Sequence, residues 1–232
     1  MQIMLETGQA ALFDNAAIAF DLDGTLVDTA PDLVRALNAV IVPRGLPAVP
    51  LADVRAMVGR GARVLLERAH ARGGAEMQDG DALVAEFIEI YKTDVAAESR
   101  AFPGVEETLA WLKDAGARLS VCTNKPSVLS DLLIAELGLA DYFERIVGPE
   151  RTSAKKPDAA HLRDSLGGAF ARAALIGDSA PDVGSARAAG LPVIVMSYGY
   201  SENPAGSLGA DRVLHAFGDV PRALAEIWQR AS

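Results

Sequence analysis

Short apolar runs separated by helical patterns recur along this chain, and they restrict the folds that it can adopt. The first run, 16–20, ends directly at Asp21. A run of this length without alternating polar residues is typical of a strand that is buried on both faces. The pattern recurs at 117–122, 173–176 and 192–196, and more weakly at 142–147. Strands that alternate with helices predict an α/β fold with a parallel sheet and helices on both faces.

One stretch, 29–100, interrupts this alternation, because it shows helical patterns but no convincing strand. Its apolar residues form two stripes at helical spacing, one between 33 and 41 and one between 83 and 95. Packing between helices explains such stripes better than a cofactor site does. We therefore predict a Rossmann-like core formed by 1–28 and 101–232, and an inserted helical cap domain, 29–100, able to move as a lid.

Composition restricts the partners and the cellular compartment that we expect for the protein. The 232 residues are half hydrophobic, which is enough for a sizeable core. The net charge is −9 and no basic run exceeds Lys155-Lys156, which argues against a nucleic-acid partner. Cys122 is alone, so no intramolecular disulfide forms, and this fits a reducing compartment. Without a signal-peptide pattern or a long apolar span, we expect a cytoplasmic monomer or homodimer with no membrane partner.

Two acids, Asp21 and Asp23, directly follow the first predicted strand. Ligands of parallel sheets bind at the carboxyl ends of the strands. Asp21 is placed to attack phosphorus and form an aspartyl-phosphate, and Asp23 to protonate the leaving alcohol and then deprotonate water. The bland alternative is a turn rich in Asp and Gly. The buried strand and the run Asp21-Leu22-Asp23-Gly24-Thr25-Leu26 favour catalysis.

A second pair of acids, Asp178 and Asp182, follows another predicted strand. Together with Asp21 and the backbone carbonyl of Asp23, Asp178 supplies the oxygen ligands that Mg²⁺ prefers. Asp182 is expected to support this site. Alternatively, Asp178 or Ser179 caps the helix that begins near Pro181, and both interpretations can hold together.

Two further groups lie at or near predicted strand ends. Thr123 and Asn124 are candidates for binding a phosphoryl oxygen, although Thr-Asn after a strand is also an ordinary turn. A lysine at 155 or 156 is placed to offset charge on the nucleophile and on the phosphoryl group. Composition does not choose between the two lysines.

The chain resembles the haloacid dehalogenase superfamily of phosphatases, in the branch similar to phosphoglycolate phosphatases. Four motifs match in order, with two further segments between and after them. They are Asp21-Leu22-Asp23-Gly24-Thr25, Phe102-Pro103-Gly104-Val105, Thr123-Asn124-Lys125-Pro126, Lys156-Pro157, Gly177-Asp178-Ser179 with Asp182, and Tyr198-Gly199-Tyr200. The ordered set is specific for the superfamily and only suggestive for the substrate.

The resemblance implies roles for these residues. It makes Asp21 the nucleophile, Asp23 the acid and base, Thr123 a phosphate ligand and Lys156 the charge stabiliser, because the family's lysine directly precedes proline. It also implies Mg²⁺ as cofactor and a helical cap after the first motif. One departure stands out: close relatives usually read Lys-Pro-x-Pro, whereas this chain has alanine at 159.

Substrate choice in the family falls largely to the cap. Gly59-Arg60-Gly61 resembles the loop that dips toward the active site, and Arg60 or Arg63 is a candidate partner for a substrate carboxylate. A surface arginine at a helix start is the competing interpretation. Lys92 lies inside an amphipathic pattern, which argues against the Schiff-base lysine of phosphonate-cleaving relatives.

We therefore predict a phosphomonoesterase for a small phosphate ester, with 2-phosphoglycolate as the leading substrate. Sugar phosphates and pyrophosphate are alternatives, as is a β-phosphoglucomutase-like phosphomutase. A binding protein on a retired phosphatase scaffold is disfavoured, since such proteins usually lose an acid that this chain keeps.

Overall fold

The computed structural model describes residues 8–230. Residues 1–7 and 231–232 of the predicted core lie outside that range, as does the start of the N-terminal stretch that we inspected for a signal peptide. Within it, a six-stranded parallel sheet has the order β5-β4-β1-β6-β7-β8. Its strands are β1 (Ala16–Phe20), β4 (Arg118–Cys122), β5 (Arg145–Val147), β6 (Arg172–Gly177), β7 (Val193–Met196) and β8 (Arg212–Leu214).

Helices cover both faces of this sheet because successive side chains of each strand point to opposite sides. Ile18 and Phe20 belong to the hydrophobic cluster shared with α5 and α9, whereas Ala17 and Ala19 belong to the cluster shared with α7 and α8. The helices of the core are α5 (Val105–Asp114), α6 (Ser127–Glu136), α7 (Ala159–Leu166), α8 (Ala180–Ala189) and α9 (Val220–Arg230). The predicted α/β, Rossmann-like fold is confirmed.

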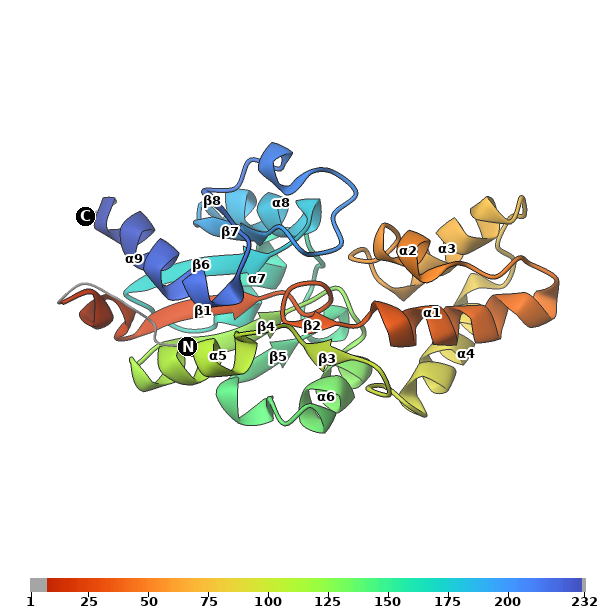
Figure 1. Ribbon diagram of the computed structural model, residues 1–232, viewed down its shortest axis with the longest axis horizontal. Helices are drawn as coiled ribbons and strands as arrows, with labels where there is room; N and C mark the ends of the chain where they lie inside the picture. Colours follow the sequence, from red (N-terminus) through yellow and green to blue (C-terminus); the bar gives the residue numbers. More distant parts are fainter. Residues whose placement is uncertain (1–7, 231–232) are drawn as a thin grey trace.

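The inserted stretch is helical, as expected. It contains α1 (Ala30–Ile41), α2 (Leu51–Arg55), α3 (Ala62–Arg72) and α4 (Gly80–Lys92). Figure 1 shows these helices together at one end of the molecule, beyond the carboxyl ends of the sheet strands. The predicted stripes are buried: α1 packs against α2 and α4, and α3 packs against α4. The division at residues 29 and 100 and the lid motion stay predictions.

Two chain segments connect the helical cap to the core, and they pair with each other. β2 (Val27–Asp28) and β3 (Arg100–Ala101) form a separate antiparallel ribbon. At its cap end, the buried Asp32 carboxylate accepts hydrogen bonds from Ser99 N at 2.8 Å and Ser99 Oγ at 2.6 Å, and from Glu98 N at 3.0 Å. The Asp32 side chain of α1 therefore holds the segment through which the chain runs from the cap back to the core.

We expect Asp32→Asn to lower the free energy of unfolding by about 1–3 kcal/mol, because it weakens hydrogen bonds to a buried carboxylate. Burial opposes ionisation, but the hydrogen bonds from Ser99 and Glu98 outweigh it and lower the pKa of Asp32. A lowered folded-state pKa contributes stability above the unfolded value and loses it as the pH falls. In thermal melts, the deficit of the variant should be full at pH 7 and shrink below about pH 4.

The matched control is Asp53→Asn, which removes an acid of the same cap that pairs with Arg72 in an exposed position. We expect this control to change stability by about 0–1 kcal/mol. A deficit of Asp32→Asn that does not change with pH would contradict the assignment.

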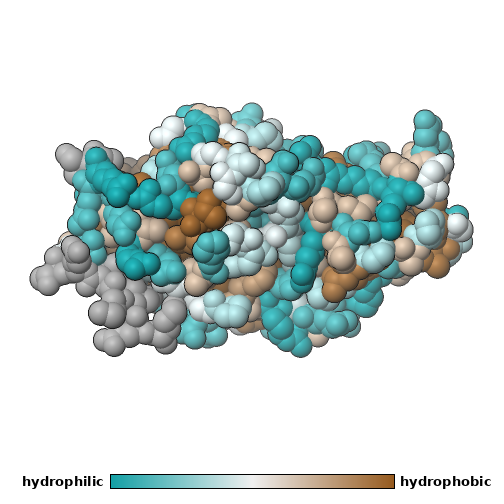
Figure 2. Space-filling view, turned by 45° about the horizontal axis from the view of Figure 1, so that its top comes forward, coloured by the Kyte–Doolittle hydropathy of each residue, from teal (hydrophilic) through white to brown (hydrophobic). Residues whose placement is uncertain are grey.

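The surface is largely polar. Figure 2 shows hydrophilic residues spread over the visible face, with hydrophobic ones only in small separate patches. Over residues 8–230, no helix combines the length and apolar character that crossing a bilayer requires.

Candidate active site

Asp21 and Asp23 meet in one cavity at the carboxyl end of β1. Asp21 is the first residue after the strand, and its backbone N–H donates to the carbonyl of Ile176 on β6 at 2.8 Å. The chain then turns, with Gly24 N donating to Val27 O at 2.9 Å. Both carboxylates line the same cavity, beneath cap residues such as Leu65. A buried strand followed by a tight turn is what brings the two acids together.

Two glycines shape the floor of this site. Gly24 has φ +86°, and a Cβ there would lie 2.7 Å from Asp178 Oδ2. A Cβ on Gly199 would lie 2.2 Å from Asp178 Cβ. Side chains at these positions would displace Asp178, so both glycines are required for close approach of the backbone to that acid.

Asp178 directly follows β6 and is held on both oxygens. Its Oδ1 accepts a hydrogen bond from Thr25 Oγ1 at 2.9 Å, and its Oδ2 accepts one from Tyr200 N at 2.6 Å. Tyr200 also accepts from Ala30 N at 3.0 Å and donates to Asp28, so the same loop reaches the cap connection. Burial, with the charges of Asp182 and Asp21, raises the pKa of Asp178 well above its ordinary value.

The helix cap that competes with a metal-binding role is formed by other residues. Ser179 is the N-cap of α8, and Asp182 completes a capping box, accepting from Ser179 N at 3.0 Å and Ser179 Oγ at 2.7 Å through Oδ2. The other oxygen, Oδ1, accepts from Lys156 Nζ at 2.7 Å. Asp182 thus caps the helix and anchors a lysine at once, and the Asp178 carboxylate takes no part in the cap.

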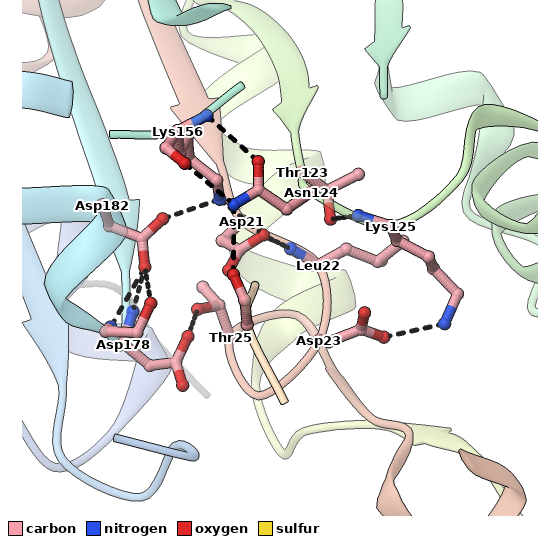
Figure 3. Close-up of polar contacts among 12 residues, drawn as sticks. Asp21, Leu22, Asp23, Thr25, Thr123, Asn124, Lys125, Lys156, Asp178 and Asp182 are labelled. Carbon is pink, nitrogen blue, oxygen red and sulfur yellow. Dashed lines mark hydrogen bonds and ion pairs between the residues drawn. The ribbon is translucent and has the colours of Figure 1, made fainter. Parts of the chain in front are cut away.

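Lys156 is the lysine that enters the site, because its neighbour Lys155 is exposed. Its buried Nζ lies 2.8 Å from Asp21 Oδ1 and 2.7 Å from Asp182 Oδ1 (Figure 3). Burial opposes its charge, but the two carboxylates outweigh that and raise the pKa of Lys156. Burial also raises the pKa of Asp21 to about 7, with the Lys156 ammonium acting in the opposite direction. Within residues 8–230, Asp21 Oδ2 accepts no hydrogen bond.

The acidic cluster fits a divalent cation. Carboxylate oxygens of Asp21, Asp178 and Asp182 lie within 4.8 Å of one another, and all three side chains are buried. Lys156 supplies the neighbouring ammonium, which balances only one of the three carboxylates when all are ionised. Uncompensated buried charge is costly, and hard cations prefer oxygen ligands. The Asp23 side chain is not in this cluster, and its predicted backbone-carbonyl contact stays a prediction.

Asn124 joins three loops around Asp21. Its Nδ2 donates to Gly59 O of the cap and to Lys156 O, both at 3.1 Å, and its Oδ1 accepts from Lys156 N at 3.0 Å. Both polar groups of the Asn124 side chain are therefore hydrogen-bonded to other parts of the protein. Thr123 Oγ1 accepts from Lys125 N at 3.1 Å, which leaves its hydroxyl hydrogen available. The substrate-binding roles of Thr123 and Asn124 stay predictions.

Lys125 is a site residue to which our sequence reasoning gave no role. Its Nζ lies 3.0 Å from Asp23 Oδ1 and 3.1 Å from the hydroxyl of Tyr91, on cap helix α4. Asp23 Oδ1 also accepts from Thr29 Oγ1 at 2.7 Å. In Figure 3, Asp23 and Lys125 lie on the opposite side of Asp21 from Asp178 and Asp182. The available signal was position, since Lys125 follows Thr123 by two residues just after a predicted strand end.

The arginines proposed from the sequence lie elsewhere. Gly61 and Gly59 line the cavity of the two acids, so the predicted loop does approach the site. Arg60 is exposed and borders two other pockets, one that includes Ser179 and one that includes Asn124 and Lys156. Arg63 is paired with Asp81 on the cap surface.

Known proteins are similar to this chain in sequence and in fold. The family described as haloacid dehalogenase-like hydrolase matches residues 18–196. A phosphoglycolate phosphatase of Caulobacter vibrioides is 51% identical over 215 residues, covering 90% of this chain and 91% of that protein. The chain belongs to the haloacid dehalogenase-like hydrolases.

Other members of this hydrolase family agree in sequence and in fold. A phosphoglycolate phosphatase of Rhodospirillum rubrum is 43% identical, with 88% of each chain covered. The crystal structure of a predicted phosphoglycolate phosphatase from Haemophilus somnus superposes with a TM-score of 0.83 at 30% identity, covering 91% of this chain and 98% of that one. CbbY from Rhodobacter sphaeroides, solved with phosphate, gives 0.75 at 26% identity over 89% and 96% of the chains.

The run that we expected to read Lys-Pro-x-Pro ends at the start of α7, where Ala159 is the first helical residue. Asp158 is the N-cap of α7, and its side chain accepts from Ala160 N at 2.8 Å. The Lys156 backbone N–H is also held by His161 Nδ1 at 3.1 Å. Alanine at 159 therefore leaves Lys156 in contact with Asp21.

Two further side chains with reactive groups, Cys122 and Lys92, take no part in the site. Cys122 is buried at the end of β4, and burial raises the pKa of its thiol to about 12, which argues against a nucleophile. Lys92 is the last residue of α4 and pairs with Glu89 at 2.9 Å.

Proposed function

We propose that this enzyme hydrolyses 2-phosphoglycolate to glycolate and phosphate through an aspartyl-phosphate on Asp21, with Mg²⁺ as its cofactor. The observation that carries the proposal is a buried carboxylate held by Lys156, with a second carboxylate in the same cavity. The names of the relatives, one of them 51% identical over 90% of this chain, support the substrate.

In the first half-reaction, a carboxylate oxygen of Asp21 bonds to phosphorus while the bond from phosphorus to the ester oxygen breaks. Asp23 donates a proton to that oxygen, and glycolate leaves. Lys156, 2.8 Å from Asp21, offsets the negative charge that gathers on the nucleophile and the phosphoryl group. Thr123 is placed to donate its hydroxyl hydrogen to a phosphoryl oxygen.

In the second half-reaction, Asp23 takes a proton from water as the water oxygen bonds to phosphorus. The bond between phosphorus and Asp21 breaks, which releases phosphate, restores the Asp21 carboxylate and leaves Asp23 protonated for the next cycle. The cap side chains over the cavity, Leu65 and Phe87 among them, limit the entry of bulk water.

We assign the cation to Asp21, Asp178 and the backbone carbonyl of Asp23, with Asp182 anchoring Lys156 beside them. When bound there, Mg²⁺ neutralises charge between the acids and the phosphoryl group, which otherwise repel each other. Thr25 and Tyr200 fix the direction of Asp178, so this chain presents its ligand oxygens in a set geometry.

The cavity is narrow, with about 30 Å³ of space for the centres of water-sized molecules, and this favours a small ester. The test is a panel of 2-phosphoglycolate, β-glucose 1-phosphate and pyrophosphate, assayed with Mg²⁺. We expect the highest kcat/KM for 2-phosphoglycolate. Conversion of β-glucose 1-phosphate to its isomer without phosphate release would favour a phosphomutase, and no release from any compound would favour a retired scaffold.

A further inference from the structure

The cavity that holds Asp21 and Asp23 is lined by a single cationic side chain within residues 8–230, that of Lys125. Lys156 contacts Asp21 without lining this cavity, and Arg60 lies outside it. The Lys125 side chain is 2% exposed. An ammonium group buried this deeply must be stabilised by anions, and it is available to an anion that enters the cavity.

The hydrogen bonds of the Lys125 ammonium leave one of its N–H groups available to a ligand. Its Nζ donates to Asp23 Oδ1 at 3.0 Å and to the Tyr91 hydroxyl at 3.1 Å. It also lies 4.4 Å from the centre of the Tyr91 ring, within the range of a cation–π contact. An ammonium has three N–H donors, and the third has no acceptor among the described residues.

Over the described part of the chain, the rest of the cavity wall carries no positive charge, since its other polar side chains are those of the two acids, Tyr91, Thr123 and Asn124. Its cap side comprises apolar side chains, namely Leu33, Val58, Ala62, Leu65 and Phe87, and Leu129 contributes from α6. Burying a carboxylate against such a wall without a partner is costly. A substrate carboxylate in this cavity therefore requires Lys125.

The geometry of the proposed reaction brings such a carboxylate to Lys125. Asp23 must reach the ester oxygen to protonate it, and Lys125 Nζ is one hydrogen bond away from Asp23. In 2-phosphoglycolate only one methylene separates the ester oxygen from the carboxylate. A leaving group that contacts Asp23 through its ester oxygen thus places its carboxylate within reach of the same ammonium.

We propose that Lys125, steadied by Tyr91 of the cap, binds the carboxylate of the leaving group and gives the enzyme its preference for carboxylated phosphate esters over neutral ones. This inference rests on the proposed hydrolysis of 2-phosphoglycolate. Because Tyr91 belongs to cap helix α4 and Lys125 to the core, the substrate carboxylate binds at the boundary between cap and core.

The test compares two substrates that differ at one group, 2-phosphoglycolate and 2-hydroxyethyl phosphate, in which a hydroxymethyl replaces the carboxylate. Selectivity is the ratio of their kcat/KM values. We expect Lys125→Gln to lower this ratio by about 100-fold, because a buried charge pair with the substrate is lost. Lys125→Arg keeps the charge and should retain most of the ratio. Arg60→Gln, the control for the other candidate, should leave the ratio within about twofold.

The ratio separates carboxylate binding from a general effect on Asp23. If Lys125 only positioned Asp23, both substrates would slow equally in Lys125→Gln and the ratio would stay as in the wild type, which would overturn the inference while leaving the proposed function intact. A fall of the ratio in Arg60→Gln instead would likewise overturn it. A wild-type enzyme without preference for 2-phosphoglycolate would overturn the proposed function and the inference together.

A second comparison covers the case in which Lys125→Gln does not fold. Asp23→Asn with Lys125→Met removes both members of the buried ion pair, so neither is left unpaired. Calorimetry then measures the binding of the two esters to this variant and to Asp23→Asn alone. We expect the preference for 2-phosphoglycolate to fall by about 100-fold when Lys125 is replaced, and an unchanged preference would refute the assignment.

Discussion

Asp21→Asn is expected to lower kcat for 2-phosphoglycolate by about 10⁴-fold or more, because a neutral amide is a far weaker nucleophile than a carboxylate. Asparagine keeps the shape of the side chain, and its oxygen can still accept from Leu22 N and Lys156 Nζ. The fold should therefore persist. Phosphate release with saturating Mg²⁺ and a thermal melt measure the two effects.

The control for this variant is Asp131→Asn, which changes an exposed acid that pairs with Arg151 away from the site. We expect its activity to stay within about twofold of the wild type. If Asp21→Asn retained a tenth of the wild-type kcat while folding normally, another group would have to attack phosphorus.

Removal of divalent cations is expected to reduce activity by about 10³-fold or more, with recovery on addition of Mg²⁺. Asp21, Asp178 and Asp182 gather three carboxylates within 4.8 Å, and Lys156 balances only one of them. An anionic ester approaching this cluster would be repelled. Assays after treatment with a chelator, with and without added Mg²⁺, measure the effect.

A cation that binds the folded state should also raise the melting temperature, which is a readout independent of turnover. At about 100 times its Kd, the cation adds about 2.7 kcal/mol, or roughly 5–10 °C for a chain of this size. Asp178→Asn should reduce this shift, since it removes the charge of an assigned ligand. Full activity after chelation, with no shift of melting temperature by Mg²⁺, would contradict the metal site.

Patterns within one segment were enough to predict most of the sheet. The fully apolar runs of β1, β6 and β7 read as buried strands because parallel strands are covered on both faces. β8 was missed, since its three residues are only half-buried at the sheet edge. β2 and β3 have two residues each, and only their pairing across the cap insertion makes them strands.

The site residues also divide into those that a local sequence pattern predicts and those that depend on contacts between distant segments. The positions of Asp21 and Asp178 could be predicted because each directly follows a buried strand. The contact of Lys125 with Tyr91 joins residues 34 positions apart, from core and cap, and no local pattern encodes it. The sequence also left open which side chain caps α8, because only the structure shows that one oxygen of Asp182 serves the cap and the other Lys156.

The most direct test of the mechanism is to find the phosphoryl group on Asp21. Asp23→Asn should slow the attack of water on the aspartyl-phosphate, while p-nitrophenyl phosphate, whose leaving group needs no proton, still phosphorylates the enzyme. We expect a burst of one nitrophenolate per chain and, after acid quenching, a phosphorylated peptide with the group on Asp21. A burst with the phosphoryl group on another residue, or turnover with no covalent intermediate, would contradict the account.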